Sequence, residues 1–549
     1  MALIVASSVP HSATLDLLAL AATVPSKMFT GSETTATFLI ILVAIGVLGW
    51  GFNRARTYGK LGIIAWLQSV VLTVPWLLFF GLFTAGIYLN IVGILFLVVA
   101  SAGLYIFLGR LLRAAGQDIV LQERATRLLN EKQQANDAQK PDEQASGTTE
   151  NLTAPSTGTN PAATEVVPIP DEDLKSIQGI FGIDTFFATE TIPYQEGVIF
   201  KGNLRGTDPE VVYSRLSSSL EQRFGDSTQP TPKEPRYRLF LVESPEGKPV
   251  VIVLPSSNDP QPATLPQNIL AVILFIVTIA TSLEAAGLLL NFDFFNNLER
   301  FPEVLPLSAG IWTVFAAHEL GHWWQAKRHN VRLSLPFFIP SWQIGSFGAI
   351  TRFESLIPSR KALFDISFAG PAAGGIASLL LLVVGLLLSH SGSAFQIPVQ
   401  FFQGSVLVGL LARVFLGASL QAALVDVHPL TIVGWLGLVV TALNLMPAGQ
   451  LDGGRVVQAI YGRKTARRAT IATLIVLGIV ALANPGNPLV LYWAIVILFL
   501  QRSLERPSLN EITEPDDTRA ILGLLALFLM VATLIPLTPA LAVRLGIGS

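Results

Sequence analysis

The sequence contains no cysteine, and this absence excludes several kinds of chemistry at once. Disulfide bonds, thiolate nucleophiles and cysteine-ligated zinc sites cannot form. Histidine is scarce as well, with 6 in 549 residues. A metal site in this chain must therefore combine a small choice of imidazoles with carboxylates.

Charge is the second shortage. Charged residues make up 13% of the chain, about half the usual share in globular proteins. Hydrophobic residues make up 51%, and the mean hydropathy is +0.55. The net charge of −2 provides no basic field for nucleic acid, so no nucleic-acid partner is expected. The composition predicts a polytopic membrane protein whose surroundings are the lipid bilayer.

The N-terminal tail, residues 1–35, has no basic segment and no arginine, so it is a poor signal or transit peptide. Residues 36–116 contain three apolar runs, which we expect to span the membrane. Arginines and lysines follow these runs and predict which side is cytoplasmic. Residues 117–168 predict a polar helix and then a flexible linker rich in Ser, Thr and Pro.

Residues 169–262 are different in character. The stretch 197–202 predicts a strand, and 208–224 predicts a helix capped by Thr207 or Asp208. Two further runs, 237–243 and 248–254, predict a hairpin. We therefore expect a small α+β domain of β-α-β-β type on the cytoplasmic side.

The run Gly-Asn-Leu-Arg-Gly at residues 202–206 leaves the first of these strands. One interpretation is a turn that needs positive φ at its glycines, with Arg205 as a surface cation. The other is a loop that contacts the membrane site or the substrate. The sequence leaves both open.

The most informative pattern is His318, Glu319 and His322, which form H-E-x-x-H near the end of the apolar run 304–326. On a helix, residues i and i+4 point the same way, which suits two nitrogen ligands of one zinc ion. Glu319 is placed to take a proton from water at the metal. The alternative is two hydrogen-bonded helix histidines beside a solvated glutamate. Ionisable residues in a spanning segment are costly and usually functional, which favours the metal site.

A zinc ion needs a third protein ligand, and we assign it to Asp452. Its apolar helix, 430–446, is expected to run antiparallel to the first and to end on the same side of the membrane. The alternative role for Asp452 is a helix cap. The competing carboxylates are Glu354, Asp365 and Asp426, while His329 is expected at the surface and His428 in a structural role.

Residues 332–354 are rich in β-formers, Pro and Gly, and predict two short strands beside the catalytic helix. They are either an edge that pairs with an extended substrate or an ordinary cytoplasmic hairpin. We expect residues 263–460 to form one transmembrane core. Residues 461–549 are expected to contain three more spans.

These motifs resemble the site-2 protease family of intramembrane zinc metalloproteases. The resemblance is carried by H-E-x-x-H at 318–322, by Asn444 and Pro447, by Leu-Asp-Gly-Gly at 451–454, and by the small-residue stretch 368–374. The run at 202–206 is similar to the cyanobacterial and plastid branch. One departure from the family pattern is Gly449-Gln450, where proline is frequent.

The resemblance implies His318, His322 and Asp452 as Zn²⁺ ligands, Glu319 as the catalytic base, and Asn444 as the residue that holds the substrate backbone. It implies an all-α polytopic membrane protein, with a site-2 protease-like core containing short membrane-dipping β-strands, plus the small α+β cytoplasmic domain. The expected function is an intramembrane zinc endopeptidase.

Its expected partner is the transmembrane segment of a membrane protein, such as an anti-sigma factor or a similar regulator. The expected location is a cell inner membrane or a thylakoid membrane, with the active site toward the cytoplasmic side. Two other functions are weighed, a catalytically inactive membrane adaptor or chaperone and a metal-ion transporter.

Overall fold

The computed structural model describes residues 169–548, apart from 195–196, 206–207, 225–235, 245, 342–343, 484–489, 491–492, 495 and 499–502. It also describes residues 48–71 and 100–112, each with short gaps. The described residues belong to two compact units, one within Thr23–Thr164 and the other from Glu165 onward. The predicted tail 1–35, the linker 117–168 and half of residues 489–504, an apolar run within the region expected to contain three more spans, lie outside the described residues.

The described part of the first unit is helical and apolar. Three side-chain hydrogen bonds connect its helix Gly62–Val71 to the neighbouring helical segments. Trp66 donates to the Leu48 carbonyl at 3.2 Å, and Gln68 donates to the Tyr105 carbonyl at 3.4 Å. Ser101 Oγ donates to the carbonyl of Val71 at 2.6 Å.

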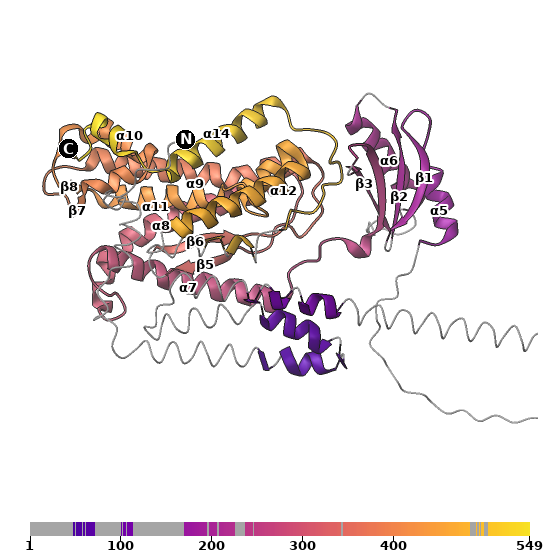
Figure 1. Cartoon of the computed structure of the whole chain (residues 1–549), viewed down its shortest axis with the longest axis horizontal. Coiled ribbons are helices and arrows are strands. Elements are labelled where there is room, and N and C mark those ends of the chain that lie inside the picture. The colour runs from indigo at the N-terminus through magenta and orange to yellow at the C-terminus, as the bar shows by residue number, and fades with distance from the viewer. Residues whose placement is uncertain are drawn as a thin grey trace, which may run out of the picture. The chain divides into compact units, whose positions relative to one another are not determined.

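The second unit begins with a four-stranded antiparallel sheet of order β1-β2-β4-β3. Its elements are α5 (Asp171–Gln178), β1 (Phe186–Tyr194), β2 (Gly197–Leu204), α6 (Pro209–Phe224), β3 (Tyr237–Glu243) and β4 (Pro249–Pro255). Helix α6 lies across one face of the sheet, where Val212, Leu216 and Leu220 enter a shared apolar core (Figure 1). Asp208 caps α6 by accepting from the Glu210 amide at 2.9 Å.

The β-α-β-β expectation for this region was incomplete, because α5 and β1 precede the predicted elements. The positive φ expected at the glycines of the run 202–206 is wrong for Gly202, which lies inside β2 and pairs with Ala188. A Cβ on Gly202 would lie 2.1 Å from the Phe187 carbonyl oxygen. Glycine is therefore required there by the close approach of β1. Arg205 follows the strand, and its guanidinium lies 5.8 Å from the centre of the Phe187 ring.

Beyond the sheet, the unit is mainly helical. Its elements are α7 (Leu265–Leu289), α8 (Phe301–Arg328), β5 (Phe337–Ser341), β6 (Gly345–Ile350), α9 (Arg360–Leu388), β7 (Phe395–Pro398), α10 (Val406–Leu416), β8 (Leu424–Val427), α11 (Pro429–Asn444), α12 (Asp452–Ala483), α14 (Asp517–Leu534) and α15 (Pro539–Leu545). The two strands predicted within 332–354 are β5 and β6, an antiparallel pair. They lie between α7 and the helices α8 and α11 (Figure 1).

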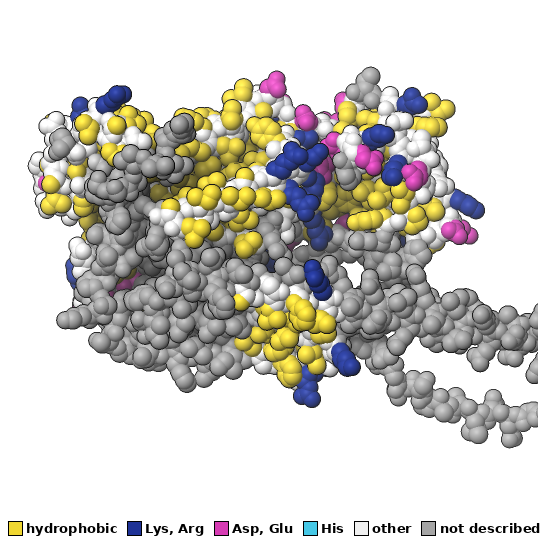
Figure 2. Space-filling model, in the orientation of Figure 1, with side chains coloured by type: hydrophobic (Ala, Val, Ile, Leu, Met, Phe, Trp, Pro, Cys, Tyr) yellow, Lys and Arg dark blue, Asp and Glu magenta, His cyan; other side chains and the backbone are white. Residues whose placement is uncertain are grey.

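Within the described residues, four helices are long and apolar enough to cross a membrane: α7, α9, α12 and α14. Many of their large apolar side chains are exposed, as on α14, where Ile521 is 66% and Phe528 is 65% exposed. Such faces suit lipid rather than water. Figure 2 shows hydrophobic side chains over the helices and a gathered band of Lys and Arg. The protein is membrane-embedded.

Two helices that carry site residues, α8 and α11, are not among those four. Helix α8 contains His318, Glu319 and His322, and the 16 residues of α11 are shorter than a normal span. Both pack against α9 through small residues. A Cβ on Gly321 of α8 would lie 2.4 Å from the Ala369 carbonyl oxygen, and one on Gly434 of α11 would lie 2.2 Å from the Leu382 amide nitrogen. Glycines on α8 and α11 thus allow both helices to approach α9 closely.

Residues 395–427 fold as the β7–β8 pair with α10 between its strands. Helix α12 bends at Gly462 (φ 77°), and its second part contains the first apolar run, 469–483, of the region expected to contain three more spans. A non-helical stretch that contains Pro447 and Gly449 separates α11 from α12, so Asp452 is the first residue of a new helix.

A short stretch joins the sheet to the helical part. We call residues 508–511 the bridging segment. The Leu241 amide of β3 donates to the Leu509 carbonyl, and the Glu511 amide donates back to Leu241, at 2.8 and 2.9 Å. On its other side, the Leu509 and Asn510 amides donate to the carbonyls of Ile357 and Pro358, just before α9. The segment therefore contacts both parts through its backbone.

Candidate metal centre

Three side chains from two helices meet in the interior. His318 Nε2 lies 3.2 Å from Asp452 Oδ2, His322 Nε2 lies 3.4 Å from the same oxygen, and the two Nε2 atoms are 3.1 Å apart. All three residues are at least nine-tenths buried. Among the described residues, no other group of His, Cys, Asp and Glu is arranged to hold a metal ion.

The size of this triangle matches a zinc site. A tetrahedral zinc with ligands at ~2.0–2.1 Å has its ligand atoms about 3.3 Å apart. Three protein ligands at such edges leave the fourth position for water or substrate. Without an ion, electron-rich atoms would face one another in a buried place, which is unfavourable. The donor set of two imidazoles and one carboxylate suits zinc.

The orientation of His322 is fixed from behind. Its Nδ1 donates to the carbonyl of Ile366 on α9 at 2.8 Å, which leaves the lone pair of Nε2 directed at His318 and Asp452. Helix α9 can come this close because it presents glycine. A Cβ on Gly370 would lie 2.1 Å from His322 Nε2, and one on Gly374 would lie 3.1 Å from His318 Nδ1.

Glu319 is half-buried, and its carboxylate is hydrogen-bonded to Thr351, which follows β6. The Thr351 hydroxyl donates to Glu319 Oε2 at 2.9 Å. Thr351 also lines a small pocket together with His322 and Asp452. A side chain next in sequence to His318 is thus held at the edge of the pocket that reaches the metal group.

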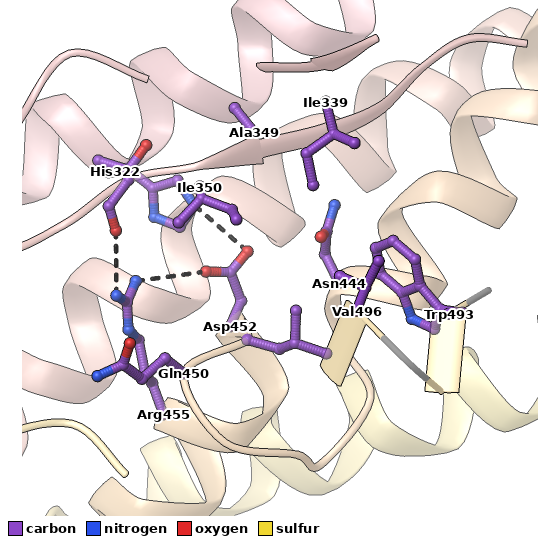
Figure 3. A pocket seen from close by; sticks show the side chains of 12 residues that line it. His322, Ile339, Ala349, Ile350, Asn444, Gln450, Asp452, Arg455, Trp493 and Val496 are labelled. Atoms are coloured by element: carbon purple, nitrogen blue, oxygen red, sulfur yellow. Dashed lines mark hydrogen bonds and ion pairs between the residues drawn. The ribbon is translucent and has the colours of Figure 1, made fainter. Parts of the chain in front are cut away.

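Asn444 is the last residue of α11, and it lines the same pocket. It lies across the pocket from His322, near Trp493 and Val496 (Figure 3). Its amide packs on β6, because a Cβ on Gly348 would lie 2.7 Å from Asn444 Nδ2. The five residues selected from the sequence are therefore gathered around one small region by α8, α11 and α12.

The competing carboxylates have other partners. Glu354 accepts from the Ala263 amide at 2.8 Å, and Asp426 accepts from the Gly392 amide at 2.7 Å. Asp365 is paired with Arg519 and with His329, whose Nε2 lies 3.0 Å away. His329 is thus a half-buried partner of Asp365 rather than a free surface histidine. His428 caps α11, as its expected structural role implies, by accepting from the Leu430 amide.

Sequence reasoning missed Thr351 and Arg455. Arg455 is 6% exposed, and its guanidinium lies beside the Asp452 carboxylate (Figure 3). A signal for Arg455 existed, because it lies three residues after Asp452 and therefore on the same helix face. Thr351 gives no such signal, since its contact with Glu319 joins residues 32 positions apart.

A buried His-His-Asp group inside a set of apolar helices defines a membrane-embedded protein with a zinc-type centre. Comparison with known families adds two matches: peptidase family M50 at residues 306–483 and the EGY3 middle domain at residues 175–262. The comparison with solved structures finds no match.

Curated relatives carry the same description. "Probable zinc metalloprotease EGY2, chloroplastic" of Arabidopsis thaliana is 39% identical over 376 residues, 67% of this chain and 65% of the relative. "Probable zinc metalloprotease EGY1, chloroplastic" of the same plant is 38% identical over 414 residues, 68% of this chain and 73% of the relative. "Probable zinc metallopeptidase EGY3, chloroplastic" is 32% identical over 378 residues. The match to the first of these relatives spans slightly less than two thirds of its length.

This chain belongs to the EGY zinc metalloproteases of peptidase family M50. The predicted resemblance to site-2 proteases, with its plastid branch, is confirmed by these matches. Zinc is the metal named for the relatives, and the buried group of His318, His322 and Asp452 fits it.

Proposed function

We propose that this protein is an intramembrane zinc endopeptidase that cleaves spanning segments of other membrane proteins. One observation carries the proposal. Three buried ligand atoms lie 3.1–3.4 Å apart, and the H-E-x-x-H glutamate is hydrogen-bonded at the edge of the adjoining pocket. His318, His322 and Asp452 are the proposed ligands, and Glu319 is the proposed base.

Zinc bound here supplies a Lewis acid that makes a water molecule nucleophilic near neutral pH. Glu319 takes a proton from the attacking water at its carboxylate and then gives it to the leaving amine nitrogen. Thr351 holds the Glu319 carboxylate through Oε2 during both transfers. The surrounding apolar helices restrict water around the reacting groups, which strengthens electrostatic interactions there.

A helical substrate must be extended before its peptide bond can reach this group. We assign the holding of the extended chain to Asn444 and to the β5–β6 pair. Support comes from the pocket, whose lining includes Asn444 and, from β6, Ala349 and Ile350. A two-stranded sheet leaves one edge of each strand without a partner strand, and an extended peptide can pair with such an edge.

We also propose that the site faces the cytoplasmic or stromal side of a thylakoid or cell inner membrane. Lys327 and Arg328 end α8 only a few residues after His322. Lys464, Arg467 and Arg468 are exposed on α12 after Asp452. Basic residues near span ends mark the inner side, and the relatives are described as chloroplastic.

The test is the Glu319→Gln variant, assayed with a single-span reporter protein and for zinc content. The expected result is loss of cleavage with zinc retained, because glutamine keeps the shape of the side chain but cannot accept the proton. Zinc transport that persists in vesicles would instead support a metal-ion transporter. Reporter cleavage unchanged from the native chain would contradict the role of Glu319, and a native chain that cleaves no reporter would favour an adaptor.

A further inference from the structure

A buried arginine lies behind the proposed metal centre, and the ligand set does not account for it. Arg455 begins the second turn of α12 and is 6% exposed. Burying a cation is costly unless its charge is paired and its donors are satisfied. The partners of Arg455 therefore show how its charge and its N–H donors are satisfied.

Glu505 carries most of that pairing. Arg455 Nε and Nη2 lie 3.0 and 2.9 Å from Glu505 Oε2, and Glu505 is itself 7% exposed. The other carboxylate oxygen of Glu505 accepts from the Arg506 amide at 3.1 Å. Both oxygens of this buried carboxylate are thus bonded.

The rest of the guanidinium faces the site. Nη2 donates to the Thr351 carbonyl at 3.0 Å, and Nη1 lies 4.0 Å from Asp452 Oδ1 (Figure 3). That oxygen is not the one directed at the two histidines, which is Oδ2. The Arg455 guanidinium therefore hydrogen-bonds to Thr351, whose hydroxyl orients Glu319, and forms an ion pair with the outer oxygen of the Asp452 carboxylate.

We propose that Arg455 is a positioning residue, which holds Asp452 and Thr351 in register so that the proposed ligand and the proposed base address the same ion. The inference rests on the proposed function for the role of Glu319. Arg455 acts through these two residues.

The charge of Glu505 is also part of this arrangement, because it is paired with Arg455. Bound zinc would carry two positive charges, which the carboxylates of Asp452 and Glu319 would balance. An unpaired Arg455 would compete with the metal for the Asp452 carboxylate. Glu505 holds Arg455 at 2.9 Å, while Asp452 lies 4.0 Å away, so the aspartate stays available to the ion.

The experiment compares three variants in the full chain. Arg455→Met removes the cation but leaves Glu505 buried and unpaired, which can prevent folding. The double variant Arg455→Met with Glu505→Gln removes both charges and avoids that cost. Arg463→Met is the matched control, because Arg463 also donates to Glu505, at its backbone carbonyl. In the described contacts it touches neither Asp452 nor Thr351.

Zinc affinity is measured by competition with a chelator, using zinc alone. Loss of an outer-shell partner typically lowers metal affinity or activity by about 10- to 100-fold. We expect a loss of zinc affinity of this size in the double variant and native zinc affinity in Arg463→Met. In the double variant we also expect kcat for reporter cleavage to fall by a larger factor than KM changes.

Native zinc affinity and native kcat in the folded double variant would overturn the proposal. An equal loss of zinc affinity in Arg463→Met would also overturn it, since a general disturbance around Glu505 would then explain the effect. The zinc readout separates this inference from the proposed function. If the native chain cleaves no reporter, the affinity comparison still decides the role of Arg455.

Discussion

At the scale of single residues, the centre depends on side chains that are oriented by their neighbours. Glu319 has Thr351 and His322 has the Ile366 carbonyl, and both of these partners come from distant parts of the chain. Asp452 has Arg455, which lies three residues later on the same helix. Mispositioning any of these groups by about an ångström costs a large factor in rate.

Thr351 gives the most direct test at this scale. Replacing it with valine removes the hydroxyl that donates to Glu319 while keeping the branched shape. General-base catalysis contributes about 10²–10⁴-fold, so we expect the loss of its orientation to lower kcat by roughly 10-fold or more. Steady-state cleavage of the reporter measures this.

Thr351→Ser is the matched control, because serine keeps the hydroxyl. It should cleave at close to the native rate. Zinc content should be native in both variants, since Thr351 is not a proposed ligand. If the valine variant matched the native kcat, Thr351 would have no part in holding the base.

The sequence predicts the proposed metal ligands more clearly than the residues that orient the ligands and the base. His318 and His322 come from a local spacing on one helix. Asp452 was selected because its helix was expected to end on the same side of the membrane, and the structure brings it to 3.2 Å from His318. Thr351 could not be selected, because nothing local in the sequence links it to Glu319.

At the scale of elements, the centre requires α8 and α9 to be unusually close. Gly370 makes this possible. A Cβ there would lie 2.1 Å from His322 Nε2, closer than atoms approach without displacement. We expect Gly370→Ala to push the imidazole away, lowering zinc content and abolishing reporter cleavage.

Gly375→Ala is the control on the same helix. Its added Cβ would lie 3.6 Å from Thr441 Cγ2, an ordinary contact. Metal analysis of the two purified variants should therefore show zinc loss at Gly370 alone. Equal zinc in both variants would mean that this part of α9 can shift without cost.

Elements with a strong pattern were predicted well, and weakly patterned ones were not. The apolar runs 268–290, 362–389 and 520–537 predict spans, and α7, α9 and α14 begin and end within three residues of those bounds. Strand β1 is an edge strand with six of its nine residues exposed, and it contains Pro193, a residue that argues against a strand when only the sequence is read. Helix α11 is apolar but short, and its burial between neighbouring helices makes a full span unnecessary.

At the scale of the whole molecule, the sheet and the helical part meet at the bridging segment, residues 508–511. Its backbone bonds to β3 on one side and to residues 357 and 358 on the other. Leu509 and Leu356 pack on the second face of the sheet, against Phe240, Val242 and Val250. Glu505, the partner of Arg455, lies three residues before the segment. The contacts of the sheet and those of the proposed metal centre thus share one short stretch of chain.

Leu509→Asp tests whether this contact holds the sheet in place. A carboxylate facing three apolar side chains is unfavourable, and the variant should release the backbone bonds between β3 and the segment. We expect hydrogen exchange at the amides of Leu241 and Glu511 to rise by ~10-fold or more, equivalent to about 1.4 kcal/mol of lost protection. Mass spectrometry of the full chain in detergent measures it.

The interior amides of the sheet provide the internal control. Val251 is fully buried on β4, and β4 pairs with both of its neighbours, so its exchange should not change. Faster exchange at Val251 as well would indicate that the whole sheet had lost stability. Native exchange at Leu241 would show that the backbone bonds hold without Leu509. If protection of the Leu241 amide and reporter cleavage fall together, the contact between the sheet and the bridging segment contributes to catalysis. The physical link is Glu505, the partner of Arg455, which lies shortly before the segment.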